Sequence, residues 1–165
     1  MDVVNPSGIH CNPAYQAIPT IANVNRSLRS FEHGIKRCET VFGIGELLHS
    51  ALKRFRKKST SAENSSAILV LHGCCLIFTP RFFREYQGFY DDTYLYGEEI
   101  ILSYQCYIKN LLLKYIDTVK VLHNESRSTK AAFKKTVQRH KFYYENIYNS
   151  TMALKRLLEK EENVK

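Results

Sequence analysis

The sequence predicts an α/β fold, because strand-like and helix-like segments alternate after residue 66. Apolar runs at 67–78 and 114–122 are typical of buried strands. The segment 98–110 has the apolar spacing of a helix, and the long basic segment 130–162 is expected to be helical as well. Alternation of this kind is typical of helices layered on a sheet. Few segments are convincing strands, so we expect only part of a doubly wound domain.

The other elements are predicted from local signals. The first 40 residues are rich in turn formers, so we expect loops and short irregular pieces there. An apolar stripe predicts a helix over 44–55, and the polar segment 59–66 is expected to be an exposed linker. Thr79 and Pro80 are typical of a helix start, and they predict a short helix over 81–87. We expect loops at 88–97 and 123–129.

This order of elements divides the chain into two parts. Residues 1–129 are expected to form the main domain, and 130–165 a basic helical extension. The chain has 165 residues, which is enough for one domain with a real core.

Charge and cysteine content narrow the class of partner and the compartment. The net charge of +8 favours anionic partners such as nucleotide phosphates, phospholipid headgroups or nucleic acid. A basic cluster at 53–58 and basic residues in the last third carry much of this charge, although such runs are most often solvated faces. The five cysteines form neither a disulfide framework nor a zinc motif, so we expect reduced thiols in the cytoplasm. No secretory signal and no transmembrane run is visible, and a peripheral membrane contact stays open.

Three motifs could carry chemistry. Gly73 begins a small and apolar segment that allows close approach of a ligand. Glu98 and Glu99 open a predicted helix, where the dipole keeps a carboxylate ionised and able to accept a proton. They diverge by about 100° around the helix axis, so only one can face a given ligand. His123 begins a polar loop after a strand. Each motif also has an ordinary structural explanation, such as first-turn acidic residues, small core cysteines or helix-capping hydroxyls.

The order and spacing of these motifs resemble the C-terminal half of family 2 glycosyltransferases. These are rhamnosyltransferase-like bacterial enzymes that build cell-surface polysaccharides. The matching segments are 72–80, 88–90, 93–102 and 123–129. The resemblance covers roughly residues 1 to 150, and the segment 5–13 fits a loop that joins the two halves of such enzymes.

This resemblance implies an A-type, Rossmann-like fold and a transfer of sugar from a nucleotide-sugar donor, usually with Mg²⁺ or Mn²⁺. The acceptor would be a polysaccharide or a lipid-linked molecule, at the inner face of the membrane. Glu99 matches the general base, with Glu98 as its neighbour or alternate, and most relatives have Asp at the position of Glu99. His123 matches a histidine that approaches the metal or the diphosphate. Donor or acceptor contacts are implied for Gly73, Cys74, Asp91, Asp92, Tyr96, Ser128 and Thr129.

One departure from the family is large. The chain contains no Asp-x-Asp metal motif, and Asp91-Asp92 lies in the acceptor-side turn. We therefore expect a truncated enzyme with little activity alone, whose nucleotide-binding half could come from a partner chain. A catalytically inactive remnant or docking subunit is the first alternative. A basic nucleic-acid-binding module ranks last, because no nucleic-acid motif accompanies the charge, and nucleic acid is not an expected partner.

Overall fold

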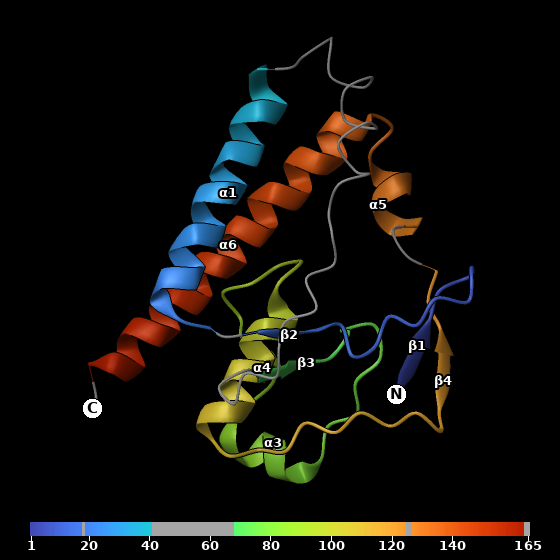
Figure 1. Ribbon diagram of the computed structural model, residues 1–165, viewed down its shortest axis with the longest axis vertical. Helices are drawn as coiled ribbons and strands as arrows, with labels where there is room; N and C mark the ends of the chain where they lie inside the picture. The colour runs from blue at the N-terminus through green and yellow to red at the C-terminus, as the bar shows by residue number, and fades with distance from the viewer. Residues whose placement is uncertain (18, 41–67, 125–126, 164–165) are drawn as a thin grey trace.

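A computed structural model describes residues 1–17, 19–40, 68–124 and 127–163 (Figure 1). These residues form a mixed α/β structure with two small sheets, so the predicted α/β class is confirmed. Two long helices lie side by side along one edge of the molecule, and the strands and shorter helices lie on the other side (Figure 1). The predicted helix at 44–55, the basic cluster at 53–58 and the predicted linker at 59–66 lie outside the described residues.

Each sheet in the described part of the chain consists of two strands. β1 (Asp2–Val4) pairs in parallel with β4 (Lys120–Leu122), and β2 (Tyr15–Ala17) pairs antiparallel with β3 (Ile68–Val70). The predicted strands at 67–78 and 114–122 are therefore too long, and only three residues of each are paired. After β3 the backbone turns at 73–75, and there the Gly73 N–H donates a hydrogen bond to the side chain of Glu99.

The first long helix, α1 (Ile21–Thr40), corrects the prediction of loops across the first 40 residues. Its buried residues Val24, Leu28 and Cys38 fall on one face, which is the pattern of an amphipathic helix. The Thr20 hydroxyl accepts the Asn23 N–H at 3.3 Å and caps the helix start. The turn formers before residue 20 shape only the segments around β1 and β2.

The second long helix, α6 (Thr136–Glu162), runs antiparallel to α1 and packs along it (Figure 1). Gly34 of α1 allows this approach, because an added Cβ would lie 2.8 Å from Cδ1 of Tyr144. The prediction of a helical C-terminal segment is confirmed for 136–162. The main core joins α1, β3, α4 and α6, and its buried members are Val24, Leu28, Ile68, Ile101, Tyr104, Ala153, Leu154 and Leu158. The predicted extension thus shares its core with residues 1–129.

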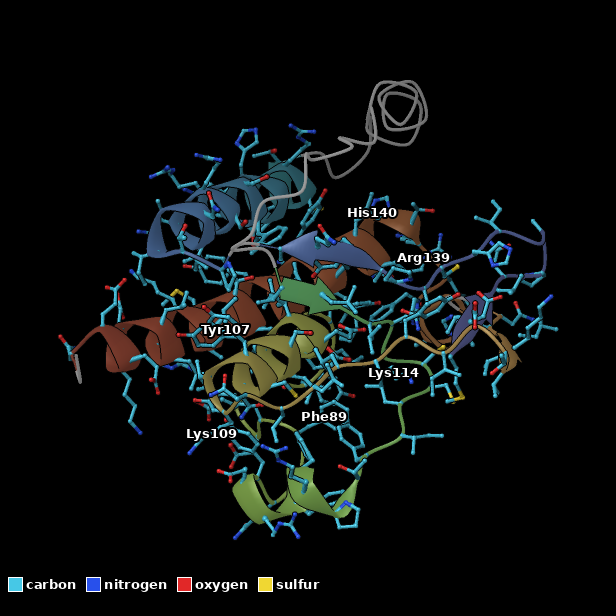
Figure 2. The ribbon with its side chains drawn as sticks, turned by 60° about the horizontal axis from the view of Figure 1, so that its bottom comes forward. Phe89, Tyr107, Lys109, Lys114, Arg139 and His140 are labelled. Carbon is cyan, nitrogen blue, oxygen red and sulfur yellow. The ribbon has the colours of Figure 1, made fainter. Side chains whose placement is uncertain are left out.

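Two shorter helices follow β3 in the chain, and the second of them also contributes to the main core. α3 (Pro80–Glu85) and α4 (Glu98–Ile108) form where helices were predicted. Phe82, Leu102 and Cys106 make a second buried cluster between them. Phe89 lies between α4 and α3 in Figure 2, and its ring contacts Phe78 with centroids 5.5 Å apart.

A further helix and the surface of α4 complete the described structure. α5 (Arg127–Ala132) occupies part of the segment predicted as a polar loop, so that prediction is wrong from Arg127 onward. At the other end of the molecule, Lys109 follows α4 (Figure 2) and pairs with Glu85 at 3.3 Å. Among the described residues, no helix combines the length and the apolar character needed to cross a membrane.

Candidate functional site

The segment that follows β3 connects two of the three motifs predicted from the sequence. The Gly73 N–H donates a hydrogen bond to Oε1 of Glu99 at 3.2 Å. The preceding residue, His72, turns its ring toward His123 at the end of β4, with ring centroids 4.9 Å apart. The third motif is brought in because β4 pairs with β1 and the His123 N–H extends that ladder to the Val4 carbonyl at 2.9 Å. The acidic helix start and the late histidine therefore both lie next to residues 72–74.

The absence of a side chain at Gly73 leaves room for the Glu99 carboxylate. A Cβ there would lie 2.7 Å from Oε1 of Glu99, so a larger residue would require the Glu99 side chain to move. Asn12 anchors the same segment from the N-terminal side and is only 5% exposed. Its Oδ1 accepts the His72 N–H at 2.9 Å, and its Nδ2 donates to the Met1 carbonyl at 2.8 Å. Backbone hydrogen bonds thus hold His72 and Gly73 between Asn12 and Glu99.

The two neighbouring glutamates lie in different environments. Glu99 is held by Gly73, while Oε2 of Glu98 is buried without a hydrogen-bond partner among the described residues. Burial raises the pKa of Glu98, and the nearby charge of Glu99 raises it further. A carboxylate whose pKa is raised toward neutral is better suited to exchange protons with a ligand. The predicted pair therefore consists of Glu99, whose carboxylate is oriented by Gly73, and Glu98, whose pKa is raised by burial.

Tyr15 lies close enough to Glu99 to interact with it electrostatically. The residue Tyr15 as a whole is 49% exposed, yet its hydroxyl is desolvated by burial. This burial raises the pKa of Tyr15 to about 12, and the charges of Glu99 and then Tyr143 add to the effect. Tyr143 also contacts the predicted site residue Tyr96, with ring centroids 4.9 Å apart. Aromatic faces beside a few polar groups are typical of binding sites for small polar ligands.

The late histidine belongs to a cluster of nitrogen and sulfur donors. One ligand atom from each of His72, Cys74 and His123 lies within 4.8 Å of the other two. Nδ1 of His123 is buried and has no hydrogen-bond partner among the described residues. Mg²⁺ and Mn²⁺ favour carboxylate, carbonyl and water oxygens, so this donor set does not fit the ions that the family resemblance implies.

Other predicted site residues lie elsewhere. Asp91 and Asp92 are exposed in the loop before α4, where Oδ2 of Asp92 pairs with Arg156 of α6 at 3.1 Å. Asp92 therefore ties a surface loop to a helix. Ser128 and Thr129 lie within α5.

A second polar cluster lies at the beginning of the chain. Oδ1 of the buried Asp2 accepts hydrogen bonds from Nδ1–H of His10 at 2.8 Å and from the Tyr115 hydroxyl at 3.0 Å. The His10 hydrogen bond is the largest influence on the Asp2 carboxyl and lowers its pKa, and the Tyr115 bond lowers it further against the effect of burial. The cluster holds β1 against the extended segment that leads to β4.

Sequence reasoning missed four residues of the site. His72 stood directly before the predicted Gly73 and two residues before Cys74, and this position was the available signal. Asn12 lay in a predicted turn, and nothing in its local sequence pointed to residue 72, which is 60 residues away. Tyr15 and Tyr143 carried no signal, because only the fold brings β2 and α6 to Glu99.

Comparison with known proteins found no relative of this chain. No protein-family model matches the chain, and neither a curated protein nor a solved structure matches it.

Proposed function

We propose that this chain is the acceptor-side portion of a glycosyltransferase of the family 2 type. In this proposal, the described elements are part of an A-type, Rossmann-like fold. The main support is the contact between Gly73 and Glu99, since it orients a carboxylate at the start of α4 beside the segment that faces His123. These are the three motifs that carry the family resemblance, and they are separate in the sequence.

The carboxylates would serve as the base for sugar transfer. Glu99, or Glu98 as its alternate, accepts the proton of an acceptor hydroxyl as the hydroxyl oxygen attacks the anomeric carbon of the donor. The bond between that carbon and the nucleotide diphosphate breaks, and the diphosphate leaves with the bonding electrons. The raised pKa of Glu98 supports a proton-accepting role for the pair. The rings of Tyr15, Tyr96 and Tyr143 would pack against the apolar faces of a sugar.

The donor would be a nucleotide sugar held largely by a nucleotide-binding half, which a partner chain could supply. Mg²⁺ or Mn²⁺ remains a prediction for that half, where it would neutralise the diphosphate. The histidine and cysteine donors described above do not suit these ions, so only the carboxylates of this chain are assigned to the proton transfer. A lipid-linked acceptor would bring the chain to the inner face of the membrane, where its positive charge would favour anionic headgroups.

The proposal is tested by ligand binding. Calorimetry with UDP-, GDP- and dTDP-sugars plus Mn²⁺, and with saccharide acceptors, should give saturable binding for at least one class. A hydrogen bond to a charged group contributes about 1.5–3 kcal/mol, so Glu99→Gln should weaken acceptor binding by roughly 10- to 100-fold. Glu159→Gln is the matched control, because Glu159 lies on α6 in a surface pair with Lys155. A flat response to every sugar, with tight salt-dependent binding of DNA or RNA, contradicts the proposal.

A docking subunit without activity is the second candidate. Large apolar side chains are exposed, notably Ile77, Leu112 and Leu122, and exposed apolar surface can mark a protein interface. For this candidate, the chain should form a stable complex with a donor-binding chain while Glu99→Gln leaves every measured affinity and rate of that complex unchanged. A loss of activity in the Glu99→Gln complex would favour the catalytic proposal.

A further inference from the structure

The cluster of His72, Cys74 and His123 has a chemistry of its own. The three residues come from two sheets, since His72 and Cys74 follow β3 and His123 follows β4. One donor atom of each lies within 4.8 Å of the other two. Two imidazoles and a thiol are borderline or soft donors, and this combination is typical of Zn²⁺ and related transition metals.

Hydrogen bonding at the cluster is compatible with a bound cation. Nδ1 of His123 is buried and has no hydrogen-bond partner among residues 1–17, 19–40, 68–124 and 127–163, and a buried polar atom in that state is unfavourable. Nδ1 of His72 accepts the Cys74 N–H at 3.2 Å, so this nitrogen carries a lone pair on the side of Cys74. A cation would satisfy the first nitrogen and replace the long hydrogen bond of the second.

The distances between the donor atoms are slightly longer than a bound Zn²⁺ requires. Zn–N bonds of ~2.0 Å and Zn–S bonds of ~2.3 Å place tetrahedral ligand atoms roughly 3.3–3.8 Å apart. The most widely separated donor atoms must therefore approach by at most about 1.5 Å. Cys74 is exposed, so rotation of its side chain can supply this change without disturbing the core.

We propose that His72, Cys74 and His123 form a binding site for a thiophilic divalent cation, Zn²⁺ in the first instance. With three protein ligands, the tetrahedral ion keeps a fourth position for water or another oxygen ligand. The ion joins the end of β3 to the end of β4 and so links the two sheets beside Glu99. This inference goes beyond the proposed sugar transfer and does not depend on it.

Metal titration of the whole chain tests this site. After treatment with a chelator, Zn²⁺ affinity is measured by competition with a chromogenic chelator, and Co²⁺ is added separately to read the ligand set by absorption. We expect one tight Zn²⁺ site and a thiolate-to-cobalt charge-transfer band with tetrahedral ligand-field bands. Zn²⁺ should also raise the melting temperature, because it binds only the folded chain tightly.

Substitutions assign the ligands. Cys74→Ser and His123→Gln should each weaken Zn²⁺ binding more than about 100-fold, beyond the 10- to 100-fold typical of losing an outer partner of a metal ligand. The cobalt charge-transfer band should disappear in Cys74→Ser. Cys75→Ser is the matched control, because the neighbouring thiol is outside the cluster, and it should keep the band and change the affinity less than about 3-fold. Circular dichroism checks the fold of each variant, and Cys74→Ser alone decides the matter if His123→Gln does not fold.

Several outcomes would contradict the proposed metal site. One is the absence of tight Zn²⁺ binding, and another is unchanged affinity in Cys74→Ser. Loss of the charge-transfer band in Cys75→Ser, or displacement of Zn²⁺ by an equal concentration of Mg²⁺, would also contradict it. Because the titration contains no sugar or nucleotide, its failure leaves the transferase proposal standing, and failure of sugar binding leaves the metal site standing.

Discussion

Gly97 is the N-cap residue between the loop at 88–97 and α4, and replacing it with alanine should destabilise the fold strongly. Its φ of 84° lies in the left-handed region, where a side chain costs about 1–2 kcal/mol. An added Cβ would also lie 2.9 Å from Cδ1 of Ile147 and 3.1 Å from Cβ of Ser150. Ser150 is fully buried, so it cannot move aside, and overpacking of this kind costs about 1–3 kcal/mol.

We therefore expect Gly97→Ala to lower the free energy of unfolding by about 2–4 kcal/mol. The loss falls below the upper limit of the two effects together, because the end of the Ile147 side chain can rotate. Urea unfolding followed by far-ultraviolet circular dichroism, with linear extrapolation, measures this difference.

Two other glycines separate backbone strain from the contact with α6. Gly8 has a φ of 78° but no atom within 4 Å of an added Cβ, so Gly8→Ala should cost about 1–2 kcal/mol from strain alone. Gly88 has neither a positive φ nor a close neighbour, so Gly88→Ala should change stability by less than about 0.5 kcal/mol. If Gly97→Ala is no more destabilising than Gly8→Ala, the result contradicts the close packing of Gly97 against α6. If Gly97→Ala is no more destabilising than Gly88→Ala, the result also contradicts the cost assigned to the positive φ.

Two further predictions concern the core and the acid stability. Leu154→Ala should destabilise the chain by about 2–5 kcal/mol, because Leu154 is 2% exposed in the main core. Leu112 is 88% exposed, so Leu112→Ala should change stability by less than about 0.5 kcal/mol in the same unfolding assay. Asp2 stabilises the fold above its ordinary pKa of 3.8, and this contribution is lost as the pH falls through its lower folded pKa. The stability gap between the wild-type chain and Asp2→Asn should therefore shrink as the pH falls below 3.8; a gap that stays constant down to full acid unfolding contradicts the lowered pKa.

The elements that sequence reasoning predicted well are those with strong local signals. α4 was predicted because apolar residues recur at helical spacing after two acidic residues, and α3 because Thr79 and Pro80 mark a helix start. α1 was missed because the turn formers before it, together with Gly34, suggested loops. A single glycine costs a helix only about 1 kcal/mol, and the packing of the Tyr144 ring at that position outweighs it.

In the candidate site, too, some residues were predicted from local signals and others were missed. Glu98, Glu99, Gly73, Cys74 and His123 were named from the sequence, and the structure brings the segments that carry them together. Their partners Asn12, His72, Tyr15 and Tyr143 come from distant parts of the chain, so local patterns gave little indication of them. The role of Asp92 was also decided at a distance, because Arg156 of α6 engages its carboxylate.

Local signals in the sequence were enough to predict the α/β class, helices close to α3 and α4, and the residue types available for chemistry, since these depend on periodicity, capping and composition within a few residues. Which of those residues come into contact depends on the tertiary fold. The pairing of β1 with β4 brings His123 into the site. The turn after β3 places Gly73 in contact with Glu99 and His72 in contact with His123. Such contacts join residues tens of positions apart, and they depend on strand register and core packing that no short window of sequence contains.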